Sequence, residues 1–249
     1  MEIKIYPDFQ KLTNAAVEAF VALSNQAIRK RGLFTVSLSG GSTPEPFYRA
    51  LGAPTNCTRV EWDHVHLFWG DERPVPPDHP DSNYRMAKDA LIDPAGLPET
   101  NIHRVPAEMD VRLAAFSYEE VLRDFFKGGW PHFDLILLGM GKDGHTASLF
   151  PRSAGLNEEQ RWFIANFAPK HETWRLTLTK HAINAAREIW IMVRGESKAG
   201  KLRDVLTGKE DPWQNPIQLV DPEDKNLTWW VDRDAAQKLP EKISLDNLM

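Results

Sequence analysis

The sequence predicts an α/β protein: a doubly wound, mostly parallel sheet with helices on both faces and a small β-rich insertion. Two observations support this fold class. Apolar, strand-like runs alternate with helix-like segments through most of the 249 residues, as they do when helices connect parallel strands. After Pro151 the alternation gives way to two short strands with no helix between them, RWFIANF and TWRLTLT. We therefore expect a single α/β domain over residues 1–249 and consider a small subdomain around residues 151–180.

The first unit is a short strand followed by a long helix. Ile3 and Ile5 alternate with charged residues, which is typical of a strand. Residues 11–31 place apolar side chains at helical spacing, with basic residues in the last turn and Gly32 immediately after. This pattern predicts an amphipathic helix that ends at the glycine.

A glycine turn follows the second predicted strand, in the segment LFTVSLSGGSTPEPFYRAL. Gly40 and Gly41 form the turn, and Ser42 or Thr43 caps a helix that has Pro44 near its first turn. The N–H groups and hydroxyls of such a turn can bind a phosphate. An ordinary capped turn between strand and helix has the same pattern, so this segment alone leaves both interpretations open.

Residues 65–69 predict a third strand, and the segment Gly-Asp-Glu-Arg follows at its carboxyl end. The planar guanidinium of Arg73 suits phosphate oxygens, which makes it a candidate anion ligand. A salt bridge from Arg73 to Asp71 or Glu72 is an equal alternative on local grounds.

The stretch FDLILLGMGKDGHTASLFP contains the strongest candidate for an active site. Its apolar run predicts a buried strand, and three glycines then form a turn that contains Asp143 and His145. We expect residues 146–150 to start a helix, so that free N–H groups in the turn face an anion or a developing negative charge. Because ligands bind at the carboxyl ends of strands in α/β sheets, the carboxylate and the imidazole are candidate catalytic groups.

The remaining segments continue the alternation. Residues 111–127 predict an amphipathic helix, and HAINAAREIWIMVRG predicts a helix and then a strand over Ile189–Val193. Lys198 opens a helix predicted over residues 197–206, where its cation can meet an anion. LTWWVDRDAAQKL closes the chain with a strand and a short helix.

Two nucleotide-binding motifs are incomplete. GMGKDG matches G-x-G-x-x-G, but the strand-like segment after it does not end in the acidic residue that would hold a ribose. GESKAGKL nearly matches a P-loop, but Leu202 occupies the position where Ser or Thr would bind Mg²⁺. We therefore expect no nucleotide cofactor.

Composition narrows the function classes further. A net charge of −5 argues against broad nucleic-acid binding, and the single cysteine, Cys57, excludes an internal disulfide and a thiolate metal cluster. His64 and His66 have no third ligand in view, so we expect no metal.

The N-terminus has no signal-peptide pattern and no apolar run reaches the ~20 residues of a membrane span, so we expect a cytoplasmic protein without membrane partners. A monomer or weak homodimer is expected.

Three strand ends then converge on one crevice, at residues 40–43, 71–73 and 139–145. The first two have anion-binding features and the third has a candidate base. This combination predicts a small phosphorylated substrate that is handled without a nucleotide or a metal.

The segments SLSGGSTP, WGDERPVPPDHPDSNY and GMGKDGHTASLFP, in this order, resemble the 6-phosphogluconolactonase family. That family belongs to a superfamily that also contains glucosamine-6-phosphate isomerase/deaminase. The resemblance runs from about Leu33 to the C-terminus. It implies a doubly wound α/β fold and a lactone hydrolase, which opens 6-phospho-D-glucono-1,5-lactone in the pentose phosphate pathway.

By that resemblance His145 is the general base, and Asp143 either orients it or favours its protonated form. A δ-lactone is an activated ester, so a water activated by a neutral imidazole suffices, and N–H groups or Arg73 can meet the oxyanion. The resemblance also implies a set of phosphate or substrate ligands: Gly40, Gly41, Ser42, Thr43, Asp71, Arg73, Arg175 and Lys198.

Two alternatives are weighed against the lactonase. Isomerase/deaminase relatives carry a Glu at the position of Phe150, and a phenyl ring cannot transfer protons. A non-catalytic sugar-phosphate sensor would keep the phosphate ligands but would have little reason to keep His145 and Asp143. Such a sensor usually carries a DNA-binding appendage, and the sequence has no helix-turn-helix or basic segment. These observations favour the lactonase.

Overall fold

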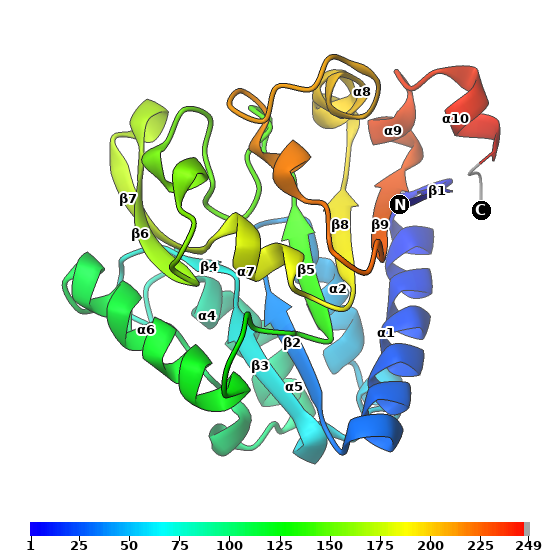
Figure 1. Ribbon diagram of the computed structural model, residues 1–249. Helices are drawn as coiled ribbons and strands as arrows, with labels where there is room; N and C mark the ends of the chain where they lie inside the picture. The colour runs from blue at the N-terminus through cyan, green and yellow to red at the C-terminus, as the bar shows by residue number, and fades with distance from the viewer. Residues whose placement is uncertain (247–249) are drawn as a thin grey trace.

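The computed structural model describes residues 1–246 and has the predicted α/β fold (Figure 1). Within these residues the main sheet has six parallel strands in the order β1-β9-β8-β5-β2-β3. A smaller antiparallel sheet has the order β4-β7-β6 and corresponds to the predicted β-rich insertion. The strands are β1 (Glu2–Tyr6), β2 (Phe34–Leu38), β3 (Val65–Trp69), β4 (Asp71–Glu72), β5 (Leu135–Gly139), β6 (Phe163–Ala168), β7 (Thr173–Leu178), β8 (Ile189–Val193) and β9 (Leu227–Asp232).

Helices connect most of the parallel strands. None of those within residues 1–246 is long and apolar enough to cross a membrane. The helices are α1 (Phe9–Arg31), α2 (Pro44–Gly52), α3 (Pro54–Cys57), α4 (Asn83–Ala87), α5 (Asp93–Ala95), α6 (Val111–Phe126), α7 (Lys180–Asn184), α8 (Ala199–Thr207), α9 (Arg233–Ala236) and α10 (Glu241–Asp246).

Helix α1 confirms the prediction for residues 11–31 but begins two residues earlier, at Phe9. Asp8 explains the earlier start, because its carboxylate accepts a hydrogen bond from the Lys11 N–H at 2.7 Å and so caps the helix. At the other end Gly32 has φ 81° and its N–H donates to the Ile28 carbonyl. The glycine therefore ends the helix in the left-handed conformation that other residues avoid.

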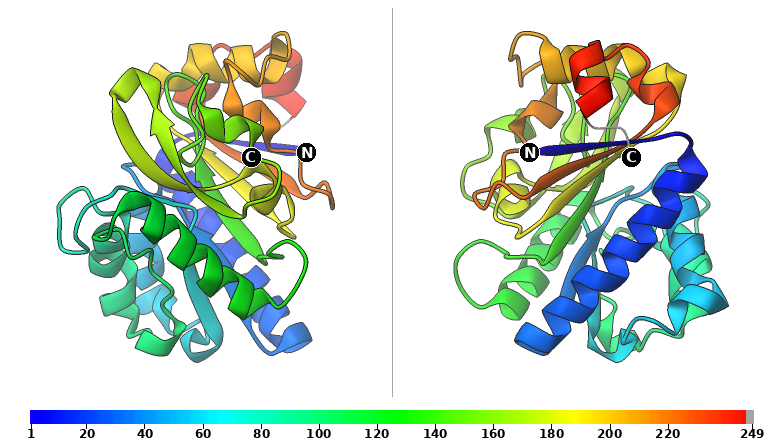
Figure 2. Two further views of the ribbon diagram at one scale, coloured as in Figure 1. Left: turned by 60° about the vertical axis from the view of Figure 1, so that its left-hand side comes forward. Right: turned by 90° about the vertical axis from the view of Figure 1, so that its right-hand side faces the viewer.

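Helices cover both faces of the main sheet. Phe34 of β2 packs edge-on against Phe20 of α1, whereas Phe68 of β3 packs against Phe125 of α6. Phe68 lies beside Ser37 in the β2–β3 ladder, so it points to the face opposite Phe34. Figure 2 accordingly shows α1 and α6 on opposite sides of the strands.

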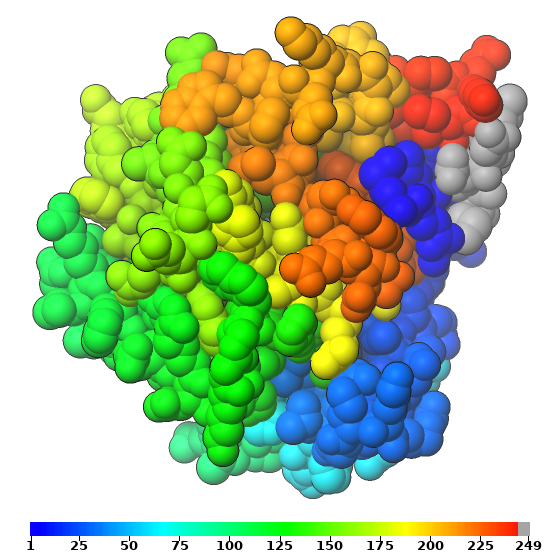
Figure 3. Space-filling model, in the orientation of Figure 1, coloured from blue at the N-terminus to red at the C-terminus, as the bar shows by residue number. Residues whose placement is uncertain are grey.

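The first and last strands of the sheet are neighbours. Strand β1 runs parallel to β9 over five residue pairs, from Glu2–Thr228 to Tyr6–Asp232. In the space-filling view the N-terminal residues (blue) therefore lie beside the C-terminal segment (red) (Figure 3). This edge of the sheet is far in strand order from β2 and β3.

The direction of strand addition reverses between β2 and β5. From β2 the chain goes outward to β3 at the sheet edge, then returns to β5 on the other side of β2 and continues to β8 and β9. Pairing between β2 and β5 is limited to Val36–Leu135 and Ser37–Ile136, so the two strands separate before their loops begin. A crevice at the carboxyl ends of two such strands is where doubly wound proteins bind ligands.

Strand β4 was not expected from the sequence. After β3 the Gly70 N–H donates to the Leu38 carbonyl of the parallel sheet, and the Gly70 carbonyl accepts from the Leu178 N–H of β7. A Cβ atom on Gly70 would lie 3.2 Å from the Ser37 hydroxyl, which leaves little room for any other residue. Gly70 thus joins the two sheets and directs Asp71 from β3 into the smaller one.

The helix expected to start within residues 146–150 does not form. Ala147 has φ 45°, which is incompatible with a right-handed helix, and the Thr146 hydroxyl donates to the Gly139 carbonyl at 2.9 Å. The Ser148 N–H donates to the Thr177 hydroxyl of β7. The segment therefore turns back toward the smaller sheet, and this long-range contact overrides the local helical preference.

Candidate active site

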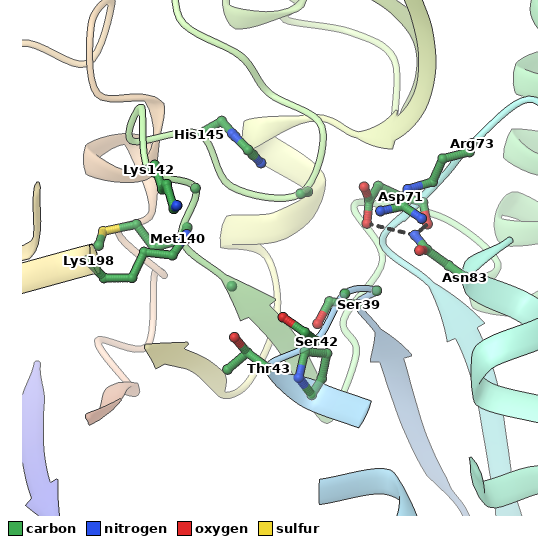
Figure 4. Close-up of a pocket in the computed structure, with 16 residues that line it drawn as sticks. Ser39, Ser42, Thr43, Asp71, Arg73, Asn83, Met140, Lys142, His145 and Lys198 are labelled. Atoms are coloured by element: carbon green, nitrogen blue, oxygen red, sulfur yellow. Dashed lines mark hydrogen bonds between the residues drawn. The ribbon is translucent and has the colours of Figure 1, made fainter. Parts of the chain in front are cut away.

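A cavity of about 280 Å³ lies in the crevice between β2 and β5 (Figure 4). Its wall combines residues 39–44 after β2, Asp71 and Arg73 after β3, residues 139–142 after β5, and Lys198 before α8. His145 and Lys142 face Ser42 and Thr43 across this space, and Asp71 and Asn83 form a third side. Residues from all three predicted strand ends thus line the same cavity.

A buried tyrosine, Tyr48, fixes the start of the turn after β2 by hydrogen bonds to its backbone. The Tyr48 hydroxyl accepts from the Ser39 N–H at 3.0 Å and donates to the Ser39 carbonyl at 2.9 Å. Burial raises the pKa of Tyr48, so the hydroxyl keeps its proton for this bond. Thr43 occupies the N-cap position of α2, but its side chain caps no N–H group, contrary to the predicted cap. The hydroxyls of Ser42 and Thr43 make no hydrogen bond to a described residue and remain available to a ligand.

Asn83 is a wall residue that the sequence analysis did not select. It is 1% exposed, and its amide N–H donates to the Asp71 backbone carbonyl at 2.8 Å. Its side-chain oxygen has no partner within the described chain and lies against Gly40, where a Cβ atom would be 1.7 Å from it. Because the Asn83 amide lies so close to the backbone, only glycine fits at position 40. The only sequence signal was the position of Asn83 inside the segment DSNY.

Asp71 and Glu72 do not form the salt bridge to Arg73 that the sequence left open. The Glu72 carboxylate instead accepts from the N–H groups of Arg73, Asn83 and Tyr84, and burial raises its pKa. The Arg73 guanidinium donates to the Asp81 carbonyl at 2.5 Å and forms part of the cavity wall. Its remaining N–H groups can therefore reach an anion.

Arg175, on β7, does not line this cavity. Its guanidinium donates to the Thr173 hydroxyl at 3.0 Å and to the Trp174 carbonyl at 2.9 Å. Burial and the positive charge of Arg73 lower the pKa of Arg175, so the two guanidinium groups influence one another. Its role as a substrate ligand stays a prediction.

His145 and Asp143 form a short-range pair at the mouth of the cavity. The Asp143 carboxylate accepts from His145 Nδ1 at 2.6 Å and from the His145 N–H at 3.2 Å. Although burial by itself raises it, the hydrogen bond and charge of His145 hold the pKa of Asp143 well below its usual range. A Cβ atom on Gly141 would lie 2.1 Å from Nδ1, so the glycine permits this contact.

The pair determines which imidazole nitrogen is available. An ionised carboxylate only accepts, so Nδ1 must carry the proton that it donates to Asp143. In the neutral ring Nε2 then has a free lone pair, and Nε2 makes no hydrogen bond to a described residue. This is the protonation pattern of a general base.

Two lysines place positive charge near the imidazole of His145. Lys198 donates from Nζ to the Met140 carbonyl at 2.6 Å and lines the cavity, as Lys142 does. Burial and the neighbouring Lys142 lower the pKa of Lys198, because both effects disfavour a further positive charge there. A bound anion would relieve this repulsion.

Phe150 packs against the imidazole at a ring-centroid distance of 4.5 Å and is 6% exposed. The position next to His145 is thus apolar and contains no second acid. Within residues 1–246 no group of three or more His, Cys, Asp or Glu side chains is arranged to hold a metal ion.

The family model of glucosamine-6-phosphate isomerases/6-phosphogluconolactonase matches residues 7–229. The chain belongs to this family. It is 40% identical over 242 residues to the 6-phosphogluconolactonase of Synechocystis sp., with 96% of this chain and 98% of that protein aligned.

Two solved structures of the family agree with the fold. The 6-phosphogluconolactonase of Trypanosoma brucei superposes with a TM-score of 0.85 at 25% identity, covering 96% of this chain and 98% of that one. A monomeric glucosamine-6-phosphate deaminase superposes with a TM-score of 0.79 at 19% identity, covering 96% of this chain and 100% of that one. The second likeness concerns the fold alone, so the fold does not separate the two activities of the family.

Proposed function

We propose that this chain is a 6-phosphogluconolactonase, which hydrolyses 6-phospho-D-glucono-1,5-lactone to 6-phosphogluconate in the pentose phosphate pathway. The observation that carries the proposal is the single oriented base, His145, facing a cavity with cations and free hydroxyls. Relatives that are 38–40% identical over nearly the whole chain carry this name. We expect the activity to persist in a chelator and without added nucleotide.

His145 acts on water in this mechanism. Nε2 removes a proton from a water molecule as the water oxygen attacks C1 of the lactone, which forms a tetrahedral oxyanion. The bond between C1 and the ring oxygen then breaks, and the imidazolium returns the proton to that departing oxygen. Asp143 keeps Nδ1 protonated and stabilises the transient positive charge, while N–H groups of the turns meet the oxyanion.

The substrate phosphate binds between the turn after β2 and the cations of the cavity wall. The turn of Gly40, Gly41, Ser42 and Thr43 supplies N–H groups and free hydroxyls, and Lys198 and Arg73 supply charge. Asp71 lies on the third side, where its carboxylate accepts from the Ser148 hydroxyl and can face sugar hydroxyls.

The alternative activity within the family is the isomerisation and deamination of glucosamine 6-phosphate. That reaction moves protons between adjacent carbons and opens a ring, so it needs several groups that titrate near neutrality. Phe150 occupies the place beside His145 where deaminase relatives have a carboxylate. Hydrolysis needs one base, which His145 supplies.

A timed assay decides between these activities. We expect the purified chain to accelerate opening of 6-phosphogluconolactone above the spontaneous rate, and to release no ammonia from glucosamine 6-phosphate. Ammonia release by the unmodified protein would reject the lactonase assignment in favour of the deaminase. Failure to act on either compound, with retained binding of 6-phosphogluconate, would instead indicate a sensor.

The proposed phosphate ligands can be tested by substrate pairs. We expect Arg73→Ala and Lys198→Ala to reduce kcat/KM for the phosphorylated lactone by about 1.5–3 kcal/mol each, with much smaller effects on unphosphorylated gluconolactone. The matched control is Lys209→Ala, an exposed lysine outside the cavity wall. Equal losses on both lactones would show that these residues do not bind the phosphate.

A further inference from the structure

A second cavity, of about 610 Å³, adjoins the catalytic pair. Lys142 belongs to the walls of both cavities, but His145 lines only the first and Asp143 only the second. The proposed lactonase mechanism uses the first cavity and leaves the second without a ligand.

The wall of the second cavity is strongly cationic. It contains Lys142, Arg152, Lys170 and Lys201, and its single acid is Asp143, which is already engaged with His145. This excess of positive charge is local, because the chain as a whole has a net charge of −5.

Among the residues that the structure describes, no acid forms an ion pair with any of these four cations. Lys142 and Lys170 make no hydrogen bond or ion pair with a described residue. Lys201 donates to the Asn215 side-chain oxygen at 2.9 Å, and Arg152 donates to the side-chain oxygen of Gln214 in the amide orientation that satisfies both groups. These partners are neutral, so the charges remain available to an anion.

An apolar wall accompanies the charges. Phe150, Pro151 and Pro169 line the same cavity. A wall of this kind suits a ring or a carbon skeleton better than a simple inorganic ion. The volume also lies within the range of pockets that hold metabolite-sized ligands.

We propose that the second cavity binds an organic phosphate of the size of a nucleoside diphosphate, as an inhibitor separate from the substrate. The phosphates contact the lysines and Arg152, and the organic part lies against Phe150 and the prolines. The negative charge then sits beside Asp143, whose hydrogen bond orients His145, so that occupation of the second cavity slows the reaction in the first. The inhibitory role rests on the proposed lactonase function, whereas the binding does not.

Calorimetric titration of the full chain with ADP tests the binding. We expect ADP to bind in the presence of saturating 6-phosphogluconate, and its affinity to fall roughly five- to tenfold in Lys170→Ala and in Arg152→Ala. Inorganic phosphate, which lacks the organic part, should bind more weakly. The exposed Lys209→Ala serves as the control and should leave the affinity unchanged.

Kinetics test the role of the same site. Without ADP, we expect Lys170→Ala and Arg152→Ala to keep the kcat and KM of the unmodified chain. With ADP, we expect kcat of the unmodified chain to fall at saturating lactone, and this inhibition should weaken in both variants.

Three results would overturn the proposal. They are the absence of ADP binding at millimolar concentration, loss of ADP binding when 6-phosphogluconate saturates the first cavity, and a tenfold higher KM for the lactone in Lys170→Ala. The last would make the second cavity part of the substrate site. Because calorimetry requires no turnover, an inactive chain that still binds ADP would reject the lactonase function and keep the site.

Discussion

Strand β5 has an aspartate near each end, and both carboxylates lie in hydrogen-bonded clusters. Before the strand, Asp134 is 3% exposed and accepts from the N–H and the hydroxyl of Thr35, at 2.8 and 3.1 Å. Arg31 and Arg187 place nitrogens 2.5 and 3.5 Å from the same carboxylate. Beyond the strand, Asp143 has one side-chain partner, the imidazole of His145.

The difference lies in what each cluster leaves unsatisfied. Around Asp134 the carboxylate accepts from Arg31 and from both donors of Thr35, so the cluster connects α1, β2 and the start of β5. Around Asp143 the imidazole keeps one nitrogen free at a cavity. The same residue type thus connects elements of the fold at the amino end of the strand and orients an imidazole beside a cavity at its carboxyl end, where the strands separate.

The largest expected effect is on activity at the carboxyl end. We expect His145→Ala to lower kcat by about 10²–10⁴, the usual range for a positioned acid–base group, with a smaller change in KM. Initial-rate assays corrected for spontaneous lactone opening measure it. His79→Ala, at an exposed loop histidine, is the matched control and should keep full activity. Near-normal kcat in His145→Ala would remove this residue from the mechanism.

The next effect is on stability at the amino end. Asp134→Ala leaves two arginines without their buried acceptor, and because both arginines can partly rehydrate we expect a loss of about 2–3 kcal/mol in the free energy of unfolding. Urea unfolding measures this loss, and the kcat of the folded fraction should stay near normal. A strong fall in kcat without loss of stability would contradict the contrast between the two ends.

The smallest effect concerns two other histidines, near the amino end of β3. His66 and His103 lie 3.1 Å apart between ring nitrogens, and burial lowers the pKa of His103 to about 4. The unfolded chain, with an ordinary pKa near 6.5, then binds more protons than the folded one between these values, so stability falls as pH decreases from about 6.5 to about 4.

We expect His103 to change the free energy of unfolding by about 1 kcal/mol over this pH range, because its partial exposure to solvent weakens the effect. Urea unfolding at pH 7.5 and pH 5.0 measures it, and His103→Asn should show a flatter pH dependence than the unmodified chain. The same slope in both proteins would mean that other groups cause the acid sensitivity.

Local patterns predicted some elements in full and others not at all. The strand Ile189–Val193 has the predicted bounds. A strand buried on both faces is a continuous apolar run, which can be recognised in the sequence without knowing its neighbours in the sheet. Gly32 ends α1 as predicted, because a left-handed cap is a property of one residue. Strand β4 has two residues and exists only through its pairing with β7, so no periodicity could show it.

The site divides in the same way. The sequence by itself placed Asp143 and His145 two residues apart in a glycine turn, but it left open whether Asp143 faces His145, and the structure shows the hydrogen bond between them. It also placed the glycine turn after β2 at a strand end, where backbone donors are free.

Only the tertiary structure decided which distant groups face that pair. Strand order brings β2 beside β5. The turn after β2 also packs so closely against Asn83 that a Cβ atom on residue 40 would lie 1.7 Å from the Asn83 side-chain oxygen. The return of residues 146–150 to β7 places Phe150 against the imidazole instead of in a helix. These contacts span many residues of chain, and their geometry follows from sheet topology and close packing, which local preference does not encode.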